Sequence, residues 1–340
     1  MANLRRFAMH GGPDLSDIRG HELYITPPGL ERGPIAGSLE NPSQSGWSLT
    51  PTAKTSPYND EFVQAFIKLG IYPYIGFRYD DGSRPAPAHN HAYLKRRLLR
   101  DRPHSPQWTS THEGRCDAQD DFCQLMQRTA ENSIKTAAVA PLEGTGAAKA
   151  DSGEWHSAMP FDNCATFGEG LPIPLAVPDL YWGAAPAKIP RSVLDHLSRF
   201  IVPGTEEHRP VAPNFFIEMG NFAERRAVNA GAIGVRAIHA LESYGRPNDE
   251  PAALGDIKAI CVTYSGTLTI YGYHQNPRKP GTPETGPSTA SCILGTWAMN
   301  NPEPPYGHDA IMAVRNAMEY AREIRDVAIQ GAIARHREAA

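Results

Sequence analysis

Two acidic side chains, Asp179 and Glu218, have the clearest chemical potential in this sequence. Each belongs to a segment that we expect to form a β-strand, residues 172–184 and residues 212–219. A carboxylate buried on an apolar strand is costly unless it is paired or bound to a metal. If the two strand ends are neighbours, the carboxylates converge and suit one Mg²⁺, a hard cation that prefers oxygen ligands. Such an ion would polarise a phosphodiester and supply hydroxide near neutral pH.

The segment APNFFIEMGN, residues 212–221, is the strand that must position Glu218. Side chains alternate between the two faces of a strand, so Phe216 and Glu218 share one face. Pro213 lies at the expected strand start, where a missing N–H is tolerated. Gly220 follows the apolar run and ends it. The pattern therefore predicts a short buried strand with a carboxylate near its exit.

The rest of the chain alternates helical and strand patterns, which predicts an α/β or α+β fold. Two β-rich runs on either side of Ser265-Gly266 are typical of a hairpin. In the helix at 222–245, Gly231 and Gly234 recur at helical spacing and indicate close packing against a sheet. We expect helices at 59–70, 90–100, 117–137, 191–200, 222–245 and 308–336, and strands at 172–184, 212–219, 257–264, 267–274 and 289–299. A flexible loop is expected at 144–158 and an irregular aromatic connection at 71–85. In the helix at 308–336, Val327 is expected on the buried side.

Residues 1–55 are rich in Gly, Pro, Ser and Thr, with apolar residues scattered singly. Such a segment cannot bury enough surface to offset the entropy of ordering, so we expect a disordered N-terminal arm. The remainder predicts a single domain over residues 56–338, with its core at 172–300.

Net charge and cysteine content bear on the ligand and the cellular compartment of this protein. The net charge of −4 creates no overall basic field for nucleic acid, so any such contact needs a local patch. Five cysteines without paired spacing indicate reduced thiols in an intracellular protein, located in nucleus or cytoplasm. No apolar run is long enough to span a membrane. The densest basic cluster, residues 95–102, is either a contact for phosphates or a solvated helix face.

Four stretches together resemble an uncharacterised group of fungal proteins, and the resemblance covers about residues 56–300. The stretches are PDLYWGA, PNFFIEMGN, AGAIGVRAIHALESYG and TYSGTLTIYGYH. The layout of that group resembles the PD-(D/E)XK nuclease superfamily, an α/β fold that cuts nucleic acids. The resemblance implies a central mixed sheet flanked by helices.

The resemblance also implies roles for individual residues. Asp179 and Glu218 would hold metal, and Glu131 on the helix ahead of the strands would give a third carboxylate. The superfamily has a Lys two residues after the Glu, to align the attacking water, but this sequence has Gly220 there. By strand alternation, a side chain at that position would share the face of Glu218. Arg226 also stands where the group usually has Gln.

Three basic residues are candidates to replace the absent Lys. Arg225 and Arg226, in the first turn of the next helix, would stabilise developing negative charge. Neither can act as a base, because a guanidinium stays protonated up to pH about 12 or higher. Lys258 is a candidate if its strand neighbours 212–219.

The leading interpretation is a nuclease-related, nucleic-acid-associated protein that lacks the motif Lys. If it is active, it would cleave phosphodiesters with Mg²⁺ at Asp179 and Glu218, and Arg225, Arg226 or Lys258 would substitute for that Lys. The alternative is a catalytically inactive nuclease-fold module, a pseudoenzyme, that binds nucleic acid or protein. A Glu218 locked in an ion pair with Arg225 or Arg236 would favour the inactive scaffold. A third hypothesis is a role in protein interaction, through the arm and the C-terminal helix.

Overall fold

The computed structural model describes residues 60–73, 77–100, 154–167, 173–206, 208–247, 250–277, 279, 286–299 and 306–339. All of them belong to one compact unit, Pro51–Ala340. The expected arm at 1–55 and the expected helix at 117–137, which carries Glu131, lie outside the described residues.

A seven-stranded mixed sheet forms the centre, with strand order β1-β7-β6-β5-β4-β3-β2. The strand pairs β4–β5 and β7–β1 are parallel, and the other four neighbouring pairs are antiparallel. The strands are β1 (Ile71–Tyr72), β2 (Glu154–Ser157), β3 (Leu180–Ala184), β4 (Val211–Met219), β5 (Ile257–Tyr264), β6 (Thr267–Asn276) and β7 (Ser288–Ala298).

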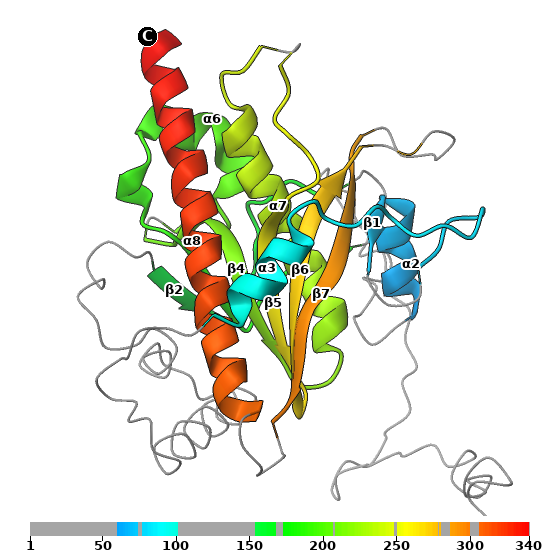
Figure 1. Cartoon of the computed structure of the whole chain (residues 1–340). Coiled ribbons are helices and arrows are strands. Elements are labelled where there is room, and N and C mark those ends of the chain that lie inside the picture. The colour runs from blue at the N-terminus through cyan, green and yellow to red at the C-terminus, as the bar shows by residue number, and fades with distance from the viewer. Residues whose placement is uncertain are drawn as a thin grey trace, which may run out of the picture. The chain divides into compact units, whose positions relative to one another are not determined.

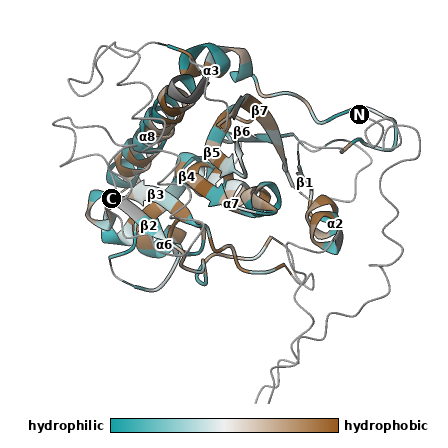
Figure 2. Ribbon diagram, turned by 90° about the horizontal axis from the view of Figure 1, so that it is seen from below, coloured by the Kyte–Doolittle hydropathy of each residue, from teal (hydrophilic) through white to brown (hydrophobic). Residues whose placement is uncertain are grey.

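Helices cover both faces of this sheet (Figures 1 and 2). Helix α7 lies against one face, and α3 and α8 lie against the other. The described helices are α2 (Asp60–Lys68), α3 (His91–Leu98), α6 (Arg191–Ile201), α7 (Ala223–Ser243) and α8 (Tyr306–Ala339), with a short 3₁₀ turn η3 (Pro186–Lys188). None of these described helices is long and apolar enough to cross a membrane.

Strand β4 shows why the sheet needs two helical layers. All nine of its residues are buried. Phe215 and Ile217 pack with residues of α8, whereas Phe216 packs with residues of α7. This is the alternation expected of a strand in the middle of a sheet, and it places Glu218 on the α7 side.

Helix α7 approaches the sheet closely because it carries glycine at the contact, as the sequence predicts. A Cβ added at Gly231 would lie 2.5 Å from the ring of Tyr273. A Cβ at Gly234 would lie 2.8 Å from Phe216 and 2.9 Å from Ala259. The glycines are therefore required by packing.

The predicted α/β fold, a central mixed sheet flanked by helices, is confirmed. Three local expectations are wrong. The expected strand at 172–184 is a strand only at 180–184, since prolines at 174 and 178 remove ladder donors. Part of the expected loop at 144–158 is strand β2, which pairs with β3. Residues 71–72, expected to be an irregular connection, pair with β7 as β1.

Candidate functional site

Asp179 and Glu218 meet at one end of the β3–β4 pair. Leu180 pairs with Ile217 in the antiparallel ladder. Continuing that register by one residue places Asp179, which directly precedes β3, opposite Glu218. Residues directly opposite in an antiparallel pair have their Cβ atoms about 5 Å apart on the same face. The predicted convergence of the two acids is therefore present.

The side chain of Arg226, in the first turns of α7, bridges the two carboxylates. Its Nη2 donates to Asp179 Oδ2 at 2.8 Å, and its Nε lies 3.0 Å from Glu218 Oε2. The second contact is an ion pair outside hydrogen-bond geometry, because neither Nε nor Oε2 has a hydrogen-bond partner. Nη2 also donates to the backbone oxygen of Met219. The guanidinium thus contacts two carboxylates and one backbone oxygen at the end of the β3–β4 pair.

The carboxylate of Asp179 also ties the two strands together at this point. Its Oδ2 accepts the backbone N–H of Met219 at 2.7 Å as well as the Arg226 hydrogen bond. One oxygen of Asp179 is therefore occupied by two donors that belong to the fold.

The three side chains of this cluster differ in exposure, and both carboxyls have raised pKa values. Glu218 is 1% exposed, while the side chains of Asp179 and Arg226 are 29% and 27% exposed. Burial raises the pKa of Glu218 well above its usual value, and Arg226 opposes that shift. Burial also raises the pKa of Asp179, opposed by Arg226 and the Met219 N–H. One guanidinium does not fully offset the desolvation of two neighbouring carboxylates.

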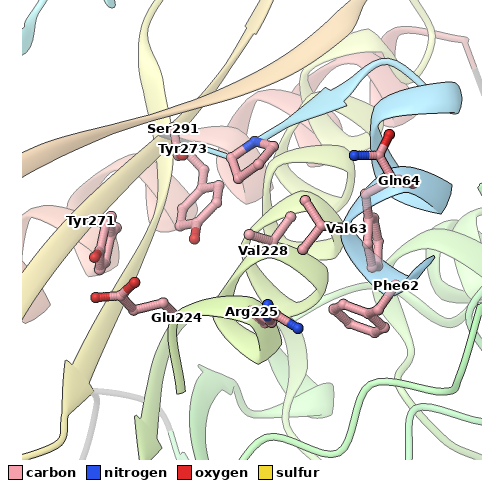
Figure 3. Close-up of a pocket in the computed structure, with 11 residues that line it drawn as sticks. Phe62, Val63, Gln64, Glu224, Arg225, Val228, Tyr271, Tyr273 and Ser291 are labelled. Atoms are coloured by element: carbon pink, nitrogen blue, oxygen red, sulfur yellow. The ribbon is translucent and has the colours of Figure 1, made fainter. Parts of the chain in front are cut away.

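Arg225 points away from Asp179 and Glu218, which together are called the acid pair. Its guanidinium lies 5.0 Å from the centre of the Phe222 ring and lines a neighbouring cavity of about 500 Å³. Figure 3 shows Arg225 beside Phe62 from α2, Val228 and Tyr273 on the same cavity lining, and Glu224 beside Tyr271. Consecutive helix residues project about 100° apart, so only one of the two arginines can reach the carboxylates.

Lys258 does not join the cluster, although β5 does neighbour β4 as the hypothesis required. Glu218 pairs with Thr263 in the parallel ladder, five residues further along β5 than Lys258. At about 3.3 Å per residue, that is roughly 16 Å along the strand. Lys258 forms an ion pair with Glu242 at 2.6 Å instead. The expectation that it replaces the missing Lys is wrong on this geometry.

Gly220 has a backbone role that strand alternation does not describe. Strand β4 ends at Met219, and Gly220 has a φ of +79°. Its N–H donates to the backbone oxygen of Tyr264 at 2.8 Å. This left-handed turn favours glycine, so the expected shared face with Glu218 does not extend to residue 220.

The ion pair expected of an inactive scaffold is present, but with a different partner. Glu218 faces Arg226 rather than Arg225 or Arg236. Arg236 donates to the backbone oxygens of Thr166 and Ala165, 70 and 71 residues away in the chain.

The basic cluster at 95–102 is only partly solvated, within its described residues 95–100. Arg97 pairs with Glu323 at 2.6 Å, and Arg100 lies over the ring of Tyr93. Lys95 and Arg96 are exposed. Two of these side chains are thus tied to the fold.

As it stands, the arrangement offers a bound Mg²⁺ at most one uncommitted oxygen from each carboxylate. Carboxylate oxygens are the right donors, but Asp179 Oδ2 already accepts two hydrogen bonds and Glu218 Oε2 faces a guanidinium. In the part of the chain that the structure describes, no three acidic, His or Cys side chains gather as a metal site. Glu131, the third expected carboxylate, lies outside that part.

Comparisons with known proteins return no match: no family model, no curated protein and no solved structure is similar to this chain. The resemblance to a fungal group and to PD-(D/E)XK nucleases therefore stays a prediction. The bridging role of Arg226 was not predicted, because it depends on the angle at which α7 leaves the turn after β4.

Proposed function

We propose that this chain is a nuclease-related protein that binds nucleic acid without cleaving it. The observation that carries the proposal is the Arg226 guanidinium, which contacts the carboxylates of Asp179 and Glu218 at the same time. An arginine supplies the positive charge that a metal would bring. It cannot supply metal-bound hydroxide, and it cannot serve as a base because it stays protonated up to pH about 12 or higher.

Nucleic acid is the ligand class that the family resemblance implies, and one feature beside the acid pair suits it. Phe222 is 42% exposed and holds a left-handed backbone with φ of +61°. For a non-glycine residue this costs about 1–3 kcal/mol, and such strain clusters at functional sites. Arg225 lies over the Phe222 ring. An exposed ring backed by a guanidinium is a platform on which an unpaired base would stack.

The experiment uses fluorescently labelled single-stranded DNA and RNA with the full chain. We expect binding at low salt that weakens as salt rises, and no cleavage in Mg²⁺ or Mn²⁺. Phe222→Ala should weaken binding at least about fivefold, the loss of one stacked base. Phe200→Ala is the matched control, since Phe200 is also exposed and near an arginine, Arg236.

Metal-dependent cleavage is the second candidate, favoured by the register that sets Asp179 opposite Glu218. It requires Arg226 to leave the pair. Cleavage by the wild type that disappears in Glu218→Ala would establish this second candidate and overturn the first. Absence of any binding at low salt would overturn both and leave the protein-interaction hypothesis.

A further inference from the structure

Among the residues that the structure describes, two serine hydroxyls contact a histidine ring, and one of these contacts continues to a third side chain. Ser192 Oγ lies 2.8 Å from His336 Nε2, whereas Ser243 Oγ lies 3.5 Å from His239 Nε2. On the other side of the His336 ring, Nδ1 lies 3.0 Å from the Tyr244 hydroxyl. A nucleophile within hydrogen-bond reach of a base, which a third group orients, is the arrangement that nucleophilic catalysis requires.

The three side chains of this hydrogen-bonded chain come from helices that pack against one another (Figure 1). Ser192 lies in the first turn of α6, Tyr244 directly follows α7, and His336 lies in the last turn of α8. Val193 and Ile333, close to two of them in the sequence, belong to one buried cluster shared by the three helices. The geometry is therefore fixed by rigid elements, as a precise site requires.

The nucleophile of this arrangement is open to a substrate. Ser192 is exposed, while His336 and Tyr244 are half-buried. An ester carbonyl can therefore approach Ser192 Oγ from solvent, while the base and the residue that orients it are held by the protein.

Two features favour His336 as the base. When Nδ1 carries the proton, it donates to the Tyr244 oxygen, and Nε2 is then free to accept the Ser192 hydroxyl proton. The C-terminal end of a helix carries partial negative charge, which favours a positively charged histidine in the last turn. In a serine protease an aspartate both orients the histidine and stabilises its charge. Here the Tyr244 hydroxyl would do the first and the end of α8 the second.

The first turn of α6 offers backbone donors beside the nucleophile. The N–H groups of Val193 and Leu194 both donate to the Pro190 oxygen. Those of Arg191 and Ser192 come before them and form no hydrogen bond with a described residue. Donors at a helix N-terminus stabilise the negative oxygen of a tetrahedral intermediate. The same turn therefore carries the nucleophile and candidate donors for the oxyanion.

We propose that Ser192 and His336 catalyse the hydrolysis of an activated ester, with Tyr244 as a positioning residue. Ser192 Oγ attacks the ester carbonyl, and His336 Nε2 takes the hydroxyl proton and gives it to the departing alcohol, which leaves the acyl group on Ser192. Water then attacks the acyl-serine, its proton passes through His336 back to Ser192, and the carboxylic acid leaves. The site lies about 27 Å along α7 from Arg226, so it does not depend on nucleic-acid binding.

The first test treats the full wild-type chain with a fluorophosphonate, which forms a P–O bond to an activated serine and releases fluoride. Mass spectrometry locates the label. We expect label on Ser192 in the native protein and its loss in urea, because His336 activates Ser192 only in the folded chain. Ser243 is the internal comparison, since it faces a histidine at the longer distance. Absence of label on Ser192, equal label on Ser243, or equal label in urea would each overturn the proposal.

The second test follows the hydrolysis of p-nitrophenyl acetate by the release of nitrophenolate. Ser192→Ala and His336→Gln should each lower kcat at least about 100-fold, the usual contribution of a general base. Tyr244→Phe removes only the hydroxyl that orients the ring, so we expect about fivefold lower kcat, the value of one hydrogen bond, with unchanged KM. Ser243→Ala is the matched control and should leave both constants unchanged. Wild-type hydrolysis no faster than that of Ser192→Ala or His336→Gln would refute the assignment.

Discussion

At the scale of single residues, burial disfavours the charged form of the acid pair, while Arg226 favours it. Glu218 is nearly fully buried, and its pKa is raised well above 4.5 by desolvation although Arg226 faces it. Asp179 is less buried, and its pKa is raised in the same direction. The sequence predicted that these two acids converge, because both lie at strand ends. It did not predict which arginine they meet, because that depends on where α7 begins.

The raised pKa of Glu218 makes stability depend on pH in a definite direction. A carboxyl with a raised folded pKa binds its proton more tightly when folded, so its contribution is complete below pH about 4.5 and declines as pH rises. We expect the wild type to lose stability relative to Glu218→Gln between about pH 5 and the folded pKa. Denaturant unfolding across pH measures this difference. A constant difference, or a wild type that gains relative stability with pH, would be inconsistent with the raised pKa.

Placing a lysine at position 220 should cost stability and give no activity. Gly220 has a φ of +79°, and a Cβ there would meet nothing within 4 Å, so the cost is backbone strain alone. Both Gly220→Lys and Gly220→Ala should lose about 1–2 kcal/mol of unfolding free energy. Gly286→Ala, a glycine with open space and no positive φ, is the control. Nuclease activity in Gly220→Lys would instead support the motif hypothesis.

Among the helices and strands, long segments with a clear hydrophobic pattern could be predicted from the sequence. Short strands that form only through pairing with a distant strand could not. The apolar run of β4 and the small-residue stripe of α7 are encoded locally, and both were predicted. Strand β2 forms because it pairs with β3. Its four residues, of mixed polarity, show no pattern that would predict this non-local contact. On α8, Val327 was expected on the buried side but is 72% exposed, whereas Arg325 is 1% exposed. When a charged residue such as Arg325 occupies a core position, the spacing of apolar residues predicts the wrong buried face.

The glycines of α7 give the sharpest test of the helix–sheet contact. Alanine has the better helix propensity by about 1 kcal/mol, so a loosely packed helix would gain stability. At Gly231 the new Cβ would overlap the ring of Tyr273, and we expect Gly231→Ala to lose about 1–3 kcal/mol. Gly331→Ala on α8, where the nearest atom is the flexible end of Arg335, should be neutral or stabilising. Equal effects at both positions would argue against close packing of α7.

At the scale of the whole molecule, α8 is joined to the sheet by polar contacts as well as by apolar packing. Arg325 Nη1 lies 3.3 Å from the Trp182 backbone oxygen and 3.2 Å from Asn214 Oδ1, and its guanidinium lies over the Trp182 ring. Burial lowers the pKa of Arg325 to about 10, and no described carboxylate pairs with it. This side chain connects the C-terminal helix to β3 and β4, the strands that present the acid pair.

Arg325→Ala should therefore destabilise the protein by about 3 kcal/mol or more, because it opens a cavity and leaves buried oxygens without donors. Arg337→Ala, exposed in the last turn of the same helix, should change stability by less than about 0.5 kcal/mol. Thermal or denaturant unfolding compares the two. A small loss for Arg325→Ala would show that α8 is held by apolar packing alone.

Calorimetric titration with Mn²⁺ shows whether Arg226 takes the place of a metal between Asp179 and Glu218. We expect no specific binding to the wild type, and binding to Arg226→Gln that disappears when Glu218→Gln is added. Stoichiometric Mn²⁺ binding to the wild type that is lost in Asp179→Ala would contradict it.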